Sequence, residues 1–271
     1  MKIGIAFIGG GVMGEAMING ILERKLASPG DITVSDVDPE RLNGLSQKYG
    51  VRVSKDNRAA VQQTDVVVLA VKPQTLDEVM ADLSGQLKQQ LLLSIVAGAS
   101  LSFLCEGFSH RQVVRAMPNA AARIGEGITL WMATKQVGKR QRAWACSILA
   151  ALGKEICIEE EKFIDMATAV SGSGPAYILL VIEAIIDAAV HIGLPRTLAE
   201  EMTLQTVLGT ARLVKVTGKH PAELRNAVTS PGGTTAEALL QLERGGLRAL
   251  FGQAIVAAHE KAKSLQGPRL K

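Results

Sequence analysis

The stretch KIGIAFIGGGVMGEAMINGILERKL, residues 2–26, decides the fold of the first part of this 271-residue chain. An apolar strand leads into a glycine turn, and an amphipathic helix begins near Val12. Gly9, Gly11 and Gly14 have the G-x-G-x-x-G spacing of a dinucleotide-binding turn. In such a turn Gly9 permits the tight bend, Gly11 lets the backbone approach a pyrophosphate, and Gly14 lets helix and strand pack closely. The pattern predicts dinucleotide binding; the alternative is a structural turn in an unrelated α/β protein.

Apolar runs of strand length alternate with helical segments as far as residue 163. After the first strand, strands are expected at residues 32–36, 51–53, 65–71, 91–98, 112–116, 127–132 and 154–158. Helices are expected between most of them, at residues 40–49, 56–63, 76–87, 101–105 and 140–152. Continuous apolar strands such as DVVVLAV, residues 65–71, are typical of parallel sheets buried on both faces. The alternation predicts an α/β fold in which residues 1–163 form a Rossmann-type, doubly wound parallel sheet that binds a dinucleotide.

Residues 164–271 carry no strand-like run and are predicted to form an all-α C-terminal domain. A helix is expected over residues 164–191, interrupted by SGSGP, and its second half is apolar on nearly every side apart from Glu183 and Asp187. Such a helix needs cover from several directions, so we expect a subunit interface and at least a homodimer through these helices. The apolar stretch 177–192 is too short to span a bilayer. We therefore expect a soluble protein without a membrane partner.

Composition narrows the classes of function. The formal net charge is +4, but Lys and Arg are spread along the chain and aromatic residues make up only 3%. Nucleic-acid binding is therefore not expected. Three cysteines without a C-x-x-C motif predict reduced, mostly buried thiols in a cytoplasmic protein. The four histidines form no H-E-x-x-H motif, so no metal site is expected.

The end of the second predicted strand bears on the choice of cofactor. Asp36 lies where an acidic residue accepts hydrogen bonds from the adenosine ribose and favours NAD. Its carboxylate would repel a 2′-phosphate. Arg41, Lys55 and Arg58 follow and could converge on such a phosphate, or they could lie on the solvated surface. These residues alone favour NAD and leave NADP open.

Two further patterns concern the substrate. In SPGGTT, residues 230–235, two glycines precede a predicted helix. Thr234 and Glu237 are expected to form a capping box at the start of this helix. Its backbone N–H groups would bind an anion, and because the first glycine turn already accounts for the pyrophosphate, an acidic substrate is suggested. Between Gly174 and Pro195 the chain has no Lys or Arg, whereas β-hydroxyacid dehydrogenases of similar plan use a lysine there to handle the hydroxyl proton. A protonated imine needs no such base, and its reduction depends mostly on placement.

Together these residues resemble the pyrroline-5-carboxylate reductase family from about residue 3 to residue 265. The most specific match is PAELRNAVTSPGGTTAEALLQLE, residues 221–243, and AVKP (70–73), VAG (96–98), RAMPN (115–119) and SGSGPAY (171–177) also match. The resemblance implies an oxidoreductase acting on a C=N bond, which reduces the cyclic imine 1-pyrroline-5-carboxylate to L-proline with NAD(P)H in the last step of proline biosynthesis. It also implies a homodimer, often assembled further, with interleaved helical domains and the active site between subunits.

The resemblance assigns roles to particular positions. Those that match cofactor contacts are Ile8, Gly9, Gly10, Gly11, Val12, Met13, Asn57, Ala70, Val71, Lys72, Pro73, Val96, Ala97 and Gly98. Those that match the loop holding the substrate carboxylate are Ser230, Gly232, Gly233, Thr234 and Thr235. The Thr235 hydroxyl, similar to one placed near the ring nitrogen, is the expected catalytic group. Relatives that prefer NADPH often carry a hydroxyl residue where this chain has Asp36, and Ser35 beside it is expected to serve instead. NADPH is the expected cofactor, with NADH possible.

Two other functions remain open. One is a reductase of the same plan that acts on another cyclic imine or ketimine, such as a six-membered ring. The other is a dinucleotide-binding protein that has lost the chemistry, against which the intact segment TSPGGTT argues.

Overall fold

The structure of the chain, a computed structural model, describes residues 3–264. The chain divides into two compact units, which we call the sheet unit (Met1–Ser173 with Ala258–Lys271) and the helical unit (Gly174–Ala257). The sheet unit extends past the predicted boundary at residue 163 because the helix that begins at Lys162 packs against the strands.

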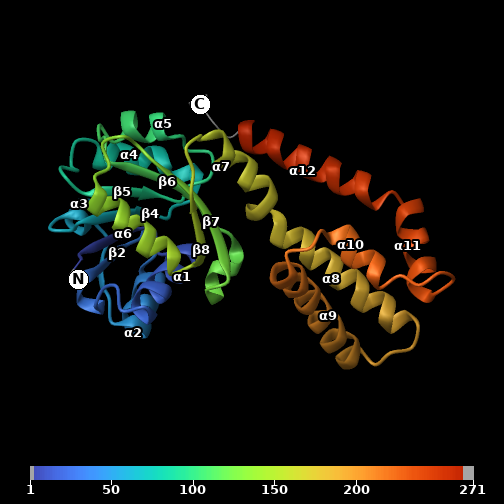
Figure 1. Cartoon of the computed structure of the whole chain (residues 1–271). Coiled ribbons are helices and arrows are strands. Elements are labelled where there is room, and N and C mark those ends of the chain that lie inside the picture. The colour runs from blue at the N-terminus through green and yellow to red at the C-terminus, as the bar shows by residue number, and fades with distance from the viewer. Residues whose placement is uncertain (1–2, 265–271) are drawn as a thin grey trace. The chain divides into compact units, whose positions relative to one another are not determined.

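The sheet unit is built on one eight-stranded sheet (Figure 1). The strands, in chain order, are β1 (Ile5–Ile8), β2 (Ile32–Ser35), β3 (Arg52–Ser54), β4 (Val66–Leu69), β5 (Leu91–Ser94), β6 (Val113–Met117), β7 (Gly127–Ala133) and β8 (Gly153–Cys157). In space their order is β3-β2-β1-β4-β5-β6-β7-β8. The chain moves outward from β1 in one direction and then, from β4, in the other. This reversal is the topological switch point of a doubly wound sheet.

One strand pair departs from the predicted parallel sheet. β7 pairs antiparallel with β6, and β8 is parallel to β7, whereas β1 to β6 are parallel throughout. Between β6 and β7 the chain makes only the short turn η3 (Ala120–Ile124). A parallel connection needs a crossover of about a dozen residues or more, so the short turn returns the chain in the opposite direction. The sheet is therefore mixed.

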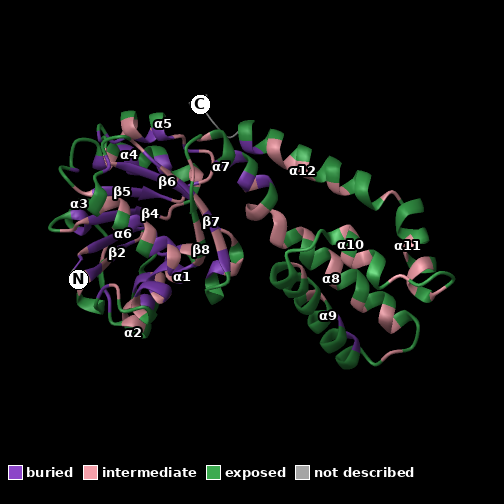
Figure 2. Cartoon of the chain, in the orientation of Figure 1, coloured by how far each residue is buried: buried purple, intermediate pink, exposed green. Residues whose placement is uncertain are grey.

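Helices cover both faces of this sheet. They are α1 (Val12–Glu23), α2 (Pro39–Tyr49), α3 (Asn57–Val61), α4 (Leu76–Leu83), α5 (Leu101–Gly107), α6 (Lys139–Ala150) and α7 (Lys162–Ala167), with short 3₁₀ turns η1 (Pro29–Asp31) and η2 (Pro73–Thr75). Ile5 and Phe7 of β1 lie in one apolar cluster with α1, α2 and α6, while Ala6 and Ile8 lie in a second with α3, α4 and α5. Because successive strand residues point to opposite faces, both clusters bury the same strands. The central strands are accordingly purple in Figure 2.

The helical unit is made of α8 (Gly174–His191), α9 (Arg196–Thr217), α10 (Pro221–Ala227), α11 (Thr234–Arg244) and most of α12 (Leu247–Ser264). The apolar pattern of the sequence predicts a last helix from Leu247 to Leu265, and Leu265 lies outside the described residues. The predicted interruption by SGSGP is a change of helix type rather than a break, because the π-helical turn η4 (Thr168–Gly172) connects α7 to α8. Lys162–His191 is therefore one helical run of 30 residues.

The structure leaves α8 without buried residues (Figure 2). Leu179 and Leu180 are 63% and 66% exposed, and an apolar groove between α8 and α12 is lined by residues that include Tyr177 and Phe251. Within residues 3–264 the run Lys162–His191 is the one helix that is long and apolar enough to cross a membrane, by length and composition only. The prediction considered only the apolar stretch 177–192, and the helix is longer than this stretch because it begins at Lys162.

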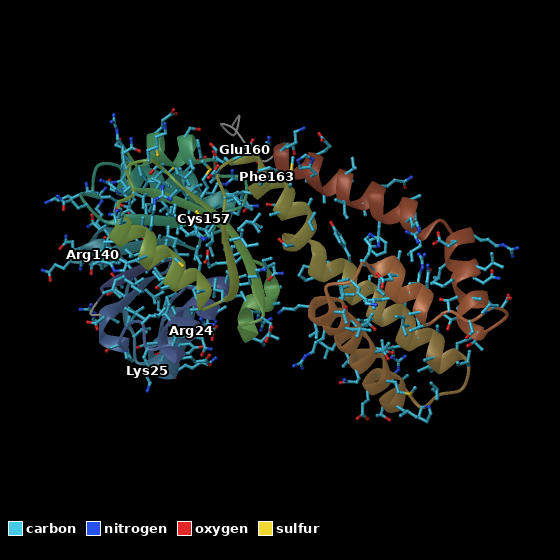
Figure 3. All side chains as sticks on the ribbon, in the orientation of Figure 1. Arg24, Lys25, Arg140, Cys157, Glu160 and Phe163 are labelled. Atoms are coloured by element: carbon cyan, nitrogen blue, oxygen red, sulfur yellow. The ribbon has the colours of Figure 1, made fainter. Side chains whose placement is uncertain are left out.

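The cysteines are less buried than predicted. Cys157, labelled in Figure 3, is exposed, and Cys105 and Cys146 are partly buried. All three are free thiols, and the burial of each raises its pKa. A raised pKa keeps a thiol protonated and unreactive at neutral pH.

Candidate functional site

The predicted cofactor-contacting residues gather at one edge of the sheet. Ile8 ends β1 and Ser35 ends β2, and these two residues are paired across the strands. Ala70–Pro73 follows β4, and the Ala70 amide donates to the Ile8 carbonyl at 2.8 Å. Val96–Gly98 follows β5, the next strand of the sheet. In open α/β sheets ligands bind outside these carboxyl ends, at the switch point. The structure brings these residues together, and their contact with a cofactor remains a prediction.

The glycine turn has the close approaches that its spacing predicts. Gly9 has a φ of 99°, and a Cβ there would lie 2.6 Å from the Ala70 carbonyl oxygen. A Cβ on Gly14 would lie 2.6 Å from the Gly9 carbonyl oxygen. A Cβ on Gly11, by contrast, would meet no atom within 4 Å. Gly9 and Gly14 are therefore required by the packing of the turn, whereas Gly11 borders open space that a ligand can enter.

The first turn of α1 can hold an anion. Gly11 is the N-cap and supplies no side-chain hydrogen bond, and its carbonyl accepts from the Glu15 amide at 2.9 Å. The amides of Val12 and Met13 belong to the first turn, where a helix offers no acceptor of its own. Val12 is 61% exposed, so this end of α1 is open to solvent. Free N–H groups, the positive end of the helix dipole and the open space at Gly11 together fit a pyrophosphate.

Asp36 and Ser35, at the end of β2, are both bonded to protein groups. Asp36 Oδ2 accepts from the Gly10 amide at 2.6 Å, and Oδ1 accepts from the Asp38 amide at 3.0 Å. Each carboxylate oxygen has a further lone pair, so Asp36 remains able to accept from a ribose hydroxyl. Ser35 is 1% exposed and its hydroxyl donates to Asn57 Oδ1 at 2.7 Å. Ser35 therefore positions the Asn57 side chain, and its buried hydroxyl does not fit the expected direct contact with a 2′-phosphate.

Arg41 is held by two neighbours from the glycine turn and α1. Its Nε donates to the Gly10 carbonyl at 2.5 Å, and its Nη2 forms an ion pair with Glu15. Glu15 Oε1 also accepts from Lys48 Nζ at 2.8 Å and from the Tyr49 hydroxyl at 3.0 Å. The hydrogen bond from Lys48, with those from Arg41 and Tyr49, lowers the pKa of the Glu15 carboxyl to about 2. Glu15 is thus a carboxylate at any ordinary pH and a counter-ion to both bases.

Convergence of Arg41, Lys55 and Arg58 on a phosphate, one of the two possibilities that the sequence left open, does not occur in the structure. Arg58 Nε donates to Asp82, at 2.8 Å to Oδ1 and 3.0 Å to the backbone carbonyl. Lys55 is exposed between β3 and α3, and Arg41 is bonded to Glu15. No local sequence pattern assigns Glu15 a role, because the packing of α2 beside α1 brings its partners to it. The one available signal was that an acidic residue directly follows Gly14.

A buried ion cluster lies under the same edge. Arg115, on β6 within the RAMPN match, is 2% exposed, and its Nη1 and Nη2 are each 2.7 Å from an oxygen of Glu161 and of Asp165. Glu161 Oε1 also accepts from the Leu101 amide at 2.7 Å. The cluster therefore links β6 to the starts of α5 and α7. A buried guanidinium requires such partners, and removing one of them leaves an unpaired charge.

The SPGGTT segment of the helical unit forms a tight turn that opens α11. The Gly233 amide donates to the Ser230 carbonyl at 3.1 Å, and Gly232, two residues after Ser230, has a φ of 69°. Pro231 at the second position and a positive φ at the third are the features of a type II turn. Thr234 and Thr235 then supply the first two amides of α11, which have no acceptor within the helix. The turn thus leaves free N–H groups at the start of α11, as an anion site requires.

The predicted capping box is wrong at this helix. Gly233, not Thr234, is the N-cap of α11, and no side chain caps the helix. The helix begins at Thr234, one residue earlier than a Thr234 cap would allow, so both threonines lie in its first turn. The hydroxyls of Thr234 and Thr235 are therefore not used as caps.

No group of three or more His, Cys, Asp or Glu side chains placed to hold a metal occurs within residues 3–264.

Family models match two parts of the chain. Residues 161–265 match a model described as pyrroline-5-carboxylate reductase dimerisation. Residues 4–98 match a model described as NADP oxidoreductase, coenzyme F420-dependent. The first match spans the helical unit, and the second spans β1 to β5.

Curated relatives and solved structures match over nearly the whole chain. The pyrroline-5-carboxylate reductase of Synechocystis sp. is 44% identical over 98% of this chain and 99% of its own. That of Escherichia coli is 36% identical over 98% and 99%. The solved pyrroline-5-carboxylate reductase of Coxiella burnetii has a TM-score of 0.87 at 38% identity and covers 99% and 100% of the two chains. The Plasmodium falciparum pyrroline carboxylate reductase, solved with NADP bound, has a TM-score of 0.90 at 31% identity and covers 98% of each.

Proposed function

The chain belongs to the pyrroline-5-carboxylate reductase family, and we propose that it reduces 1-pyrroline-5-carboxylate to L-proline with NADPH or NADH. The supporting observation is the 44% identity to the Synechocystis sp. enzyme over almost the full length of both chains, which includes both glycine-led helix starts. The reaction is the last step of proline biosynthesis.

In this proposal the sheet unit holds the dinucleotide. The amides of the first turn of α1 bind the pyrophosphate, and Asp36 and Asn57 lie at the ribose end of the site. The segments Ala70–Pro73 and Val96–Gly98 line the rest of the edge. A bound reduced nicotinamide supplies the hydride that the imine carbon accepts. The sheet residues contribute orientation, because the position of the donor sets the rate of such a transfer.

The helical unit supplies the substrate groups. The amides at the start of α11, with Ser230, Gly232, Gly233 and Thr234, hold the substrate carboxylate. The Thr235 hydroxyl, which caps no helix, lies in the same first turn and orients the ring nitrogen. No lysine is needed in α8, because an imine that carries a proton on nitrogen is electrophilic without an acid–base partner. The absence of Lys and Arg between Gly174 and Pro195 agrees with this chemistry.

A second copy of the chain covers α8 in the proposed enzyme. The helix buries none of its own residues, although it is rich in Leu and Ile. An exposed apolar surface of this kind marks an interface. Residues 164–271 then act as the dimerisation and substrate-binding domain, and residues 1–163 as the dinucleotide-binding domain. With this face paired, the protein is proposed to be cytoplasmic, without a membrane or nucleic-acid partner.

The test is direct. The purified full-length chain is mixed with 1-pyrroline-5-carboxylate and either NADPH or NADH. We expect loss of absorbance at 340 nm with matching formation of L-proline. A six-membered cyclic imino acid serves as the comparison substrate and should turn over more slowly. No proline with either cofactor would refute the proposal, and faster turnover of the six-membered ring would assign the chain a different imine.

A further inference from the structure

Glu15, on the first turn of α1, lies in direct contact with a base that could read the cofactor's 2′ position. Arg41 belongs to α2, which follows the end of β2, where the adenosine ribose binds in such sheets. An arginine near that strand end is the usual partner of a 2′-phosphate. Here Arg41 Nη2 is paired with Glu15, and Arg41 Nε is bonded to the Gly10 carbonyl.

The glycine turn is held by two side chains that bond to the two backbone groups of Gly10. Asp36 Oδ2 accepts from the Gly10 amide at 2.6 Å, and Arg41 Nε donates to the Gly10 carbonyl at 2.5 Å. Asp36 and Arg41 are therefore both close to the turn and to the ribose end of the site. A carboxylate that neutralises Arg41 here acts on the same small region in which a 2′-phosphate would add negative charge.

Each base bonded near the glycine turn has an acidic partner. Glu15 and Asp36 are acidic, and Arg41 and Lys48 are basic, with Lys48 Nζ 2.8 Å from Glu15 Oε1. The Glu15 side chain is only 22% exposed, so water screens its contact with Arg41 incompletely. With Glu15 in place neither base has an unopposed charge to offer a dianionic phosphate. The same arrangement leaves a ribose with a free 2′-hydroxyl unaffected, because Asp36 can accept from it.

We propose that Glu15 is a specificity-determining residue that holds Arg41 away from the 2′ position and so lowers the affinity for NADP relative to NAD. The inference rests on the proposed use of a nicotinamide cofactor and adds which residue sets the choice between its two forms. Asp36 acts by repelling a 2′-phosphate, and Glu15 acts by withholding the cation that would attract it.

The test measures binding without turnover. Dissociation constants of NAD⁺ and NADP⁺ are determined by titration calorimetry on the full-length chain, with no imine present. We expect Glu15→Gln to tighten NADP⁺ by about tenfold relative to NAD⁺, because one screened unit charge is removed beside Arg41. Glu23→Gln is the matched control, since it removes the same charge from the same helix at an exposed site bonded to Asn19. It should leave the ratio of the two constants unchanged.

Variants of Arg41 provide a second, independent measurement. Arg41→Gln alone should change NADP⁺ affinity by less than about threefold, because the bonded guanidinium contributes little, and in the Glu15→Gln background it should cancel the gain. An unchanged ratio in a folded Glu15→Gln variant would overturn the inference. Tighter NADP⁺ binding that persists when Arg41→Gln is added to Glu15→Gln would also overturn it. A large loss of NADP⁺ affinity in Arg41→Gln alone would do the same, and this variant can be measured even if Glu15→Gln does not fold. Failure of the unaltered protein to bind either dinucleotide would instead refute the proposed function.

Discussion

The glycine turn before α1 and the SPGGTT turn before α11 are two helix starts of the same kind in different surroundings. Each has a glycine N-cap, no side-chain cap and free amides in its first turn. The first is enclosed by its own unit, since Gly9 and Gly10 are buried and bonded to Ser35, Asp36 and Arg41. The second is bonded within its own turn and to the helix that it opens, and it is largely exposed.

The difference extends to the units that carry the two turns. The central strands of the sheet unit are fully buried, whereas α8 of the helical unit has no buried residue. The sheet unit thus completes its core within one chain. The helical unit leaves its most apolar helix uncovered, so the surroundings of its turn are expected to depend on a second copy.

A charge on the apolar face of α8 should have the largest effect, which is on dimer formation. Leu180→Asp places a charge on α8 at a residue that is 66% exposed in one chain. Burying that charge in an interface is unfavourable, so the dissociation constant of the dimer should rise by more than about 100-fold. Light scattering at micromolar concentration measures it. Ile124→Asp, the same change at an exposed residue of the sheet unit, is the control. A Leu180→Asp protein that remains dimeric would show that α8 does not form the interface.

The second turn is tested by Thr235→Ala. The loss of one positioned polar group should lower kcat/KM for the imine by roughly 10- to 1000-fold. The dissociation constant of the dinucleotide should stay the same, because the proposed cofactor residues lie in the sheet unit. Thr235→Ser, which retains the hydroxyl, should recover most of the rate. An alanine variant with the activity of the unaltered protein would show that the hydroxyl has no part in the reaction.

The first turn is tested by Asp36→Ser. Removing the carboxylate from the ribose end should shift the ratio of kcat/KM values toward NADPH by about tenfold, which corresponds to about 1.4 kcal/mol. The serine also loses the acceptor of the Gly10 amide, so affinity for both cofactors should fall. Asp36→Asn keeps an acceptor and separates the two effects. If neither variant alters the ratio, Asp36 does not face the ribose.

The smallest expected effect concerns the stability of the first turn. The hydrogen bonds from Lys48 and Arg41 lower the pKa of Glu15 from its ordinary value of 4.5 to about 2 in the folded protein. The contribution of Glu15 to stability is therefore present above pH 4.5 and is lost as the pH falls toward 2. Allowing for solvent screening, Glu15→Gln should cost about 1 kcal/mol at pH 7. The difference from the unaltered protein should shrink below pH 4.5 in urea denaturation. An equal difference at pH 7 and pH 3 would show that the charge of Glu15 does not stabilise the fold.

Local patterns were sufficient for much of the sheet unit. The alternating runs predicted the strands and helices because each strand is buried on both faces and each helix on one. They could not predict the antiparallel β7, whose direction follows from the length of the turn before it. Nor could they predict that Thr234 lies inside α11, because cap positions depend on one or two residues of backbone geometry.

The sequence by itself determined the glycine spacing, the helical character of the second half and the match to a reductase family. Each of these features depends only on which residue types lie near one another along the chain. The tertiary structure decided which charges meet. The Glu15, Arg41 and Lys48 side chains are brought together only by the packing of α1 and α2 beside β1 and β2. Arg115, Glu161 and Asp165 meet only because α7 packs on β6. Ion pairs between residues distant in the chain depend on a folded core to hold them, and no local pattern records them.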